Sequence, residues 1–63
     1  MEGIESLEVS LTHWEAMALA QFVKRLTWSE LEACSVDENE AYLMRAAIDK
    51  LQIALREYGY APR

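Results

Sequence analysis

Residue types that commonly build functional centres are scarce in this chain of 63 residues. It holds one cysteine (Cys34), one histidine (His13) and two glycines (Gly3 and Gly59). A lone cysteine excludes an intramolecular disulfide, and one cysteine with one histidine argues against a metal cluster. Two isolated glycines exclude a glycine-rich phosphate-binding loop. We therefore expect neither a metal nor a cofactor.

Basic residues are also few, because six Lys and Arg stand against eleven Asp and Glu and give a formal net charge of −5. Nucleic-acid backbones and anionic membranes both require clustered bases, so we expect no direct binding to either. A negative surface suits a basic protein partner, or serves solubility alone.

Long apolar runs and a basic leader are missing as well. No stretch approaches the roughly 20 apolar residues of a membrane span. Glu2, Glu5 and Glu8 stand where a signal peptide would carry bases. One unpaired cysteine suits a reducing compartment. The sequence therefore predicts a cytoplasmic protein.

The length allows one small domain, residues 1–63. A chain of this size buries only about 60% of its unfolded surface and gains little stability from its core alone. The hydrophobic fraction is nevertheless 52%. We expect tight helix packing, with apolar surface left over for dimerisation or for another partner.

Residues 38–58 carry the clearest pattern, which predicts a long helix. Asp37 and Glu40 form a capping-box arrangement at its start, and Gly59 follows where a helix end favours a left-handed backbone. Spacings of three and four place one apolar stripe on this helix, namely Ala41, Met44, Ile48, Leu51, Leu55 and Tyr58.

Two more helices are predicted before it, at residues 13–26 and 28–34. Thr12 with Glu15, and Thr27 with Glu30, each form a capping box. The first of these helices is expected to pack its main stripe against the long helix in antiparallel contact, through Leu19, Phe22 and Leu26.

Residues 1–11 are expected to form an extended arm or a single strand. Leu7, Val9 and Leu11 alternate with Glu8 and Ser10, which is the period of a strand with one apolar face. A single strand must pair with a second copy, pair with a partner, or collapse on the helices. The predicted fold is all-α: two main antiparallel helices, a short connecting helix and this arm.

An acidic cluster is the main candidate for partner binding. Eleven residues without Lys or Arg contain Glu30, Glu32, Asp37, Glu38 and Glu40. The cluster could imitate a row of phosphates, or its acids could simply cap helices and offset helix dipoles.

Aromatic and apolar residues off the main stripes supply further candidates. Trp14 and Trp28 are expected to close the core at helix corners. A second apolar surface for dimerisation or partner contact is expected from Tyr42, Leu43, Ile53 and Tyr60. Of these, Tyr42 and Tyr60 join the acids as candidate partner-binding residues.

Catalysis is not expected. His13 occupies a first helical position that is normally solvated, and Cys34 has no basic neighbour and is expected to be a small buried residue. A chain of this size also offers little room for a substrate pocket.

The chain resembles a family of short bacterial proteins of unknown function. The resemblance covers most of the chain after residue 10, through Leu11-Thr12, Glu15-Ala16, Ala18 to Arg25, Asp37, Glu40 to Arg45, Ala47 and Gly59 to Arg63. It implies no function and no active residues, but it makes the Gly-Tyr-Ala-Pro ending part of the module.

Three functions compete. The first is an acidic inhibitor that covers a basic or nucleic-acid-binding surface of a partner protein, such as a phage-type antagonist of a host nucleic-acid or defence complex. The second is a structural accessory or homodimeric subunit of a larger assembly. The third is a regulator of the ribbon-helix-helix kind, whose paired strands would enter the major groove of DNA. Its outward Glu8 and Ser10 would face phosphates unfavourably, so we retain only its dimeric character.

Overall fold

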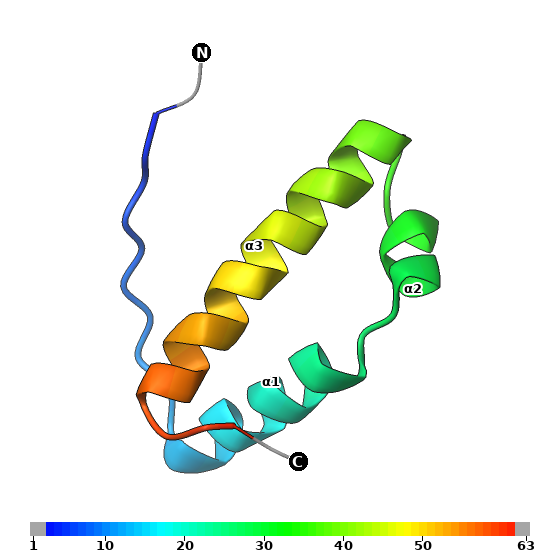
Figure 1. Ribbon diagram of the computed structural model, residues 1–63. Coiled ribbons are helices and arrows are strands. Elements are labelled where there is room, and N and C mark those ends of the chain that lie inside the picture. The colour runs from blue at the N-terminus through cyan, green and yellow to red at the C-terminus, as the bar shows by residue number, and fades with distance from the viewer. Residues whose placement is uncertain (1–2, 62–63) are drawn as a thin grey trace.

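The computed structural model describes residues 3–61, which form three helices after an extended arm (Figure 1). The helices are α1 (His13–Arg25), α2 (Trp28–Ala33) and α3 (Glu38–Glu57). Residues 3–11 form the arm, and no strand occurs within the described range. The predicted all-α fold is confirmed, and α1 runs antiparallel to α3 (Figure 1).

The helices begin where their capping residues predict. Thr12 Oγ1 accepts the Glu15 N–H at 3.1 Å, while Glu15 Oε1 accepts the Thr12 N–H at 2.8 Å. The same reciprocal pair joins Thr27 and Glu30 at the start of α2. Each box satisfies backbone donors that a helix start leaves without partners.

The start of α3 differs in one contact from the predicted capping box. Asp37 Oδ1 accepts the Glu40 N–H at 2.8 Å, as expected for an N-cap. The Glu40 carboxylate, however, accepts the Val36 N–H at 2.9 Å instead of the N–H of Asp37. The acid therefore reaches one residue further back and fixes the connection from α2.

Each helix ends one residue earlier than the sequence predicts, at residues 25, 33 and 57. The predicted last residues are the C-caps Leu26, Cys34 and Tyr58. After α3, Gly59 has φ 96°, and the Tyr60 N–H donates to the Leu55 carbonyl at 2.9 Å. The Gly59 N–H donates to the Arg56 carbonyl, so the two bonds form a Schellman motif that turns the chain back.

The core lies where α3 packs against α1 and α2. Ala16, Ala20 and Val23 of α1 are buried with Leu55 of α3. Around this cluster pack the half-buried side chains of Leu19, Ile48, Leu51 and Tyr60. Leu31 of α2 and Ala41 of α3 are also buried.

Three aromatic residues expected in the core are exposed instead. Trp14 is 75% exposed and Tyr58 is 86% exposed, and Phe22 is also exposed. The helix α1 turns Ala16 and Ala20 toward α3, and these small side chains allow a close approach that a stripe containing Phe22 would prevent. Tyr58 stands at the C-cap, beyond the packed turns. Trp28 is half-buried, so only it partly fulfils the expected closing role.

The molecule is a thin layer of helices. Its extents are 34 × 28 × 15 Å. In Figure 1, α1 and α2 lie beside α3, and both pack on it. None of the helices formed by residues 3–61 has the length and hydropathy that crossing a membrane requires.

Candidate functional site

The connection between α2 and α3 gathers the candidate acids at one corner of the molecule. We call residues 26–44, which include α2, the connection and the first turns of α3, the α2–α3 corner (Figure 1). The corner contains all five acids of the predicted cluster, and four of them are exposed: Glu30, Glu32, Asp37 and Glu38. Glu40 is half-buried.

Backbone contacts hold three of these acids in place. Glu30, Asp37 and Glu40 accept the N–H groups of Thr27, Glu40 and Val36 respectively. Ser35 tightens the same connection, since its Oγ donates to the Leu31 carbonyl at 2.6 Å. Glu32 and Glu38 take no part in these contacts. Glu38 lies in the first turn of α3, where the helix dipole favours an acid. The capping and dipole interpretation thus accounts for four carboxylates and leaves Glu32.

The α2–α3 corner also carries the charge imbalance of the whole chain. It contains five acids and no Lys or Arg, whereas the remaining six acids are matched by six bases. The nearest base on α3 is Arg45, whose Nε lies 3.3 Å from Asp49 Oδ1 in an exposed ion pair. The net charge of −5 therefore resides at this corner.

An aromatic pair stands beside these carboxylates. The rings of Trp28 in α2 and Tyr42 in α3 lie 4.9 Å apart between centroids and are inclined by 44°. This separation falls within the range of favourable aromatic contacts. Tyr42 is exposed and Trp28 is half-buried, so part of the pair remains open to a partner.

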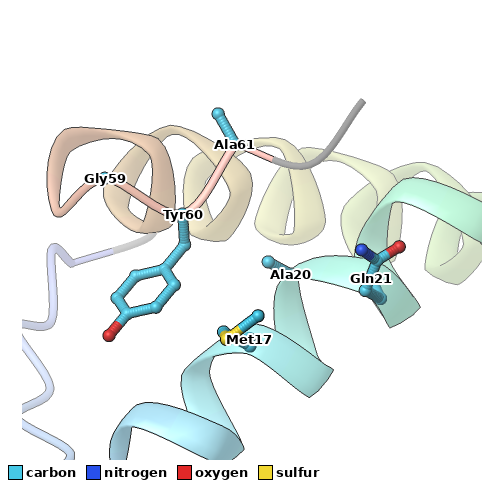
Figure 2. A pocket seen from close by; sticks show the side chains of 6 residues that line it. All are labelled: Met17, Ala20, Gln21, Gly59, Tyr60 and Ala61. Carbon is cyan, nitrogen blue, oxygen red and sulfur yellow. The ribbon is translucent and has the colours of Figure 1, made fainter.

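Tyr60, the other aromatic candidate, lies at the opposite end of α3. It follows the last turn, roughly 22 Å along the helix axis from Tyr42 at about 1.5 Å per residue. Its ring packs against the core cluster over α1, beside Met17 and Ala20 (Figure 2). The structure therefore separates Tyr60 from the α2–α3 corner, and Tyr60 is not part of an exposed apolar surface.

A contact that the sequence pattern did not indicate holds Tyr60 there. Its Oη lies 2.9 Å from His13 Nδ1 in a hydrogen bond between residues 47 positions apart. The His13 ring also meets the Trp14 ring edge-on, with centroids 5.3 Å apart. Nothing in the local spacing connects residue 13 with residue 60, because the contact depends on the turn at Gly59.

The hollow beside Tyr60 is small. It measures about 220 Å³ and is lined by Met17, Ala20, Gln21, Gly59, Tyr60 and Ala61 (Figure 2). Ligand pockets are typically about 300–1,000 Å³. Gln21 is the one lining residue with a polar side-chain amide, and it projects away from the Tyr60 ring (Figure 2).

The two residues considered for chemistry lie apart on the surface. His13 is exposed, as expected for a first helical position. Cys34, which the sequence predicts to be buried, is instead exposed at the C-cap of α2. Among residues 3–61, no three His, Cys, Asp or Glu side chains are grouped to hold a metal ion.

The off-stripe apolar residues of α3 face solvent. Leu43 and Ile53 are exposed, as is Tyr42, whereas Tyr60, the fourth residue of the predicted second apolar surface, is half-buried. Fold and surface thus define a small all-α protein whose net negative charge is concentrated at one corner.

Comparison with known families identifies the family of this chain. The family model described as Family of unknown function (DUF7706) matches residues 1–63, and the chain belongs to this family. The expected match to a family without a known function is thereby confirmed. Neither a curated protein nor a solved structure matches the chain.

Proposed function

We propose that this protein is a non-enzymatic interaction protein that binds a basic partner protein through the α2–α3 corner. The observation that carries the proposal is the concentration of the net charge at that corner, beside the partly open Trp28–Tyr42 pair. Complementary charge steers encounter and sets orientation, and exposed aromatic faces accept Arg and Lys side chains.

The capping contacts support this role as well as the fold. A carboxylate that accepts a backbone N–H keeps its negative charge, so Glu30, Asp37 and Glu40 still contribute to the surface potential. Their hydrogen bonds also limit side-chain motion. A partner would therefore meet charges that are already positioned, which lowers the entropic cost of binding.

The sharper form of the proposal is an inhibitor. A cluster of carboxylates on a small protein can occupy a basic groove that otherwise binds phosphates. In this form the protein is a phage-type antagonist of a host nucleic-acid or defence complex, and it acts in the cytoplasm by covering a surface.

A second candidate, a structural accessory subunit, is favoured by a different observation. Leu43 and Ile53 are exposed on α3, and the arm exposes a further row of apolar side chains. Such surface is typical of chains that complete their packing in an assembly. This candidate requires an apolar partner surface instead of a basic one.

A pull-down with charge-matched variants tests the first candidate. Wild-type protein is immobilised and exposed to nuclease-treated lysate of the native host at low and high salt. The variant E32Q/E38Q removes two corner charges that make no capping contact. The variant E5Q/E57Q removes two charges elsewhere and serves as the control.

We expect a basic protein to be retained by the wild type and by the control at low salt, and to be lost with E32Q/E38Q and at high salt. Equal retention by both variants would contradict binding through the corner. A partner that survives high salt would favour the accessory subunit.

A further inference from the structure

The arm leaves its backbone hydrogen-bonding groups and its apolar side chains exposed. Within residues 3–61, no hydrogen bond holds the backbone of residues 3–11. Its apolar side chains are also in water, with Leu7 86% exposed and Val9 73% exposed. An extended segment with free N–H and C=O groups and one apolar face is a template for strand pairing.

The molecule exposes more surface than a compact chain of its size. A compact chain of 7.2 kDa is expected to expose about 4,100 Å², whereas this chain exposes 5605 Å². The excess is about 1,500 Å², while each partner of a standard interface buries about 800 Å². Domains normally bury their apolar faces between packed elements. Among residues 3–61, α3 packs on α1 and α2, and side chains such as Ile53 on the rest of its surface stay exposed.

A groove already joins the arm to the open side of the helical layer. It measures about 300 Å³, and Val9 and Leu11 line it together with Leu51, Ala54 and Tyr58 of the α3 end. Because Val9 remains mostly exposed, the groove is only partly filled by its own arm. A second apolar strand could lie beside the first and complete the cover.

The arm sequence is suited to pair with itself. Residues 7–11 read apolar, polar, apolar, polar, apolar in both directions about Val9. An antiparallel pair centred on Val9 places Leu7 opposite Leu11 and all apolar side chains on one face. It also places each Glu8 opposite a Ser10, whereas a pair centred on Glu8 would oppose two carboxylates at a cost in stability.

We propose that a second copy of this chain pairs its arm with the first, antiparallel and centred on Val9, to form a two-stranded ribbon that covers the α3 side of both helical layers. The self-complementary register makes the contact isologous, as a twofold dimer requires. The arm leaves α1 on the side of the molecule away from α2, so the two acidic corners stay apart (Figure 1). The inference is therefore independent of partner binding through the α2–α3 corner.

Sedimentation equilibrium of the full chain tests the dimer. We expect the wild type to have the mass of a dimer, and V9D to raise the dissociation constant about a hundredfold or more, because two carboxylates would meet on the apolar face. The control S6D adds the same charge on the polar face of the same arm and should leave the dimer nearly unchanged. A wild type that stays monomeric up to about 1 mM, or a V9D dimer as strong as that of S6D, would overturn the proposal.

A second variant tests the register without weakening the fold. S10K places a cation opposite Glu8 of the other copy, so it should lower the dissociation constant about fivefold. The control S29K makes the same charge change on α2, away from the arm. Equal dissociation constants for the S10K and S29K dimers would show that the pairing centred on Val9 is wrong. This test remains valid if V9D unfolds, which its circular dichroism would reveal.

Discussion

The helix starts and the arm differ in whether their backbone polar groups have hydrogen-bond partners. At Thr12, Thr27 and Asp37, a side-chain oxygen accepts the N–H group of the third residue of the helix that follows. Across residues 3–11, the extended backbone finds no such partner within the described chain. Residues close in sequence therefore supply the hydrogen bonds that a helix start needs, whereas an extended alternating segment needs a second strand to supply its own.

The largest loss of stability is expected from a charge placed in the core. L55D places a carboxylate in the core cluster, where Leu55 is almost fully buried. The cost should exceed the roughly 3–5 kcal/mol that a small core supplies. We expect far-ultraviolet circular dichroism to show that L55D has lost its helices at room temperature.

The matched change in the arm is L7D, which adds the same group at an exposed position. The individual helices should remain, since residue 7 makes no core contact in one chain. An L55D protein with full helicity would contradict the assignment of the core.

The end of α3 should respond less strongly, through backbone strain. Gly59 has φ 96°, and the space that a Cβ would occupy there is open, so only the backbone conformation opposes a side chain. G59A should lower the free energy of unfolding by about 1–2 kcal/mol. Urea unfolding measures this loss, and G3A in the arm is the control, which should change stability little. Equal stability of the two variants would show that the turn does not need its left-handed residue.

Local patterns predicted much of the fold because they describe interactions between near neighbours. Capping pairs three residues apart and a glycine after the last turn specify where a helix begins and ends. They give the starts of α1, α2 and α3 and the Schellman turn at Gly59. Which face of α1 is buried depends instead on how closely α3 approaches, so the spacing pattern wrongly predicts Phe22 in the core in place of Ala16 and Ala20.

Removal of a helix cap should have an effect of about 1 kcal/mol. T12A leaves the Glu15 N–H without its acceptor and should lower the free energy of unfolding by this amount. The counterpart in the arm, S10A, should leave the unfolding of the helices unchanged. Urea titrations followed by circular dichroism compare the two, and a T12A protein as stable as S10A would show that solvent replaces the cap at no cost.

The candidate site was only partly predictable for the same physical reason. The acids are close in sequence, so their gathering at the α2–α3 corner follows from one short connection. Tyr60 is close in sequence to Gly59 but meets His13 only after the chain has turned back across α1. A spacing pattern reveals that the acids are close together, but it contains no information about the contact between Tyr60 and His13.

The smallest effect is expected from the hydroxyl group that ties the tail to α1. Y60F keeps the ring against the core cluster and removes only the hydrogen bond to His13, so it should lower the free energy of unfolding by about 0.5 kcal/mol at an exposed site. Y42F is the control, since it removes a hydroxyl at the other end of α3. If Y60F and Y42F have the same free energy of unfolding in urea, burial of the Tyr60 ring alone holds the tail in place. A measurable loss only in Y60F would show that the tail, unlike the arm, is fixed by a polar contact within its own chain.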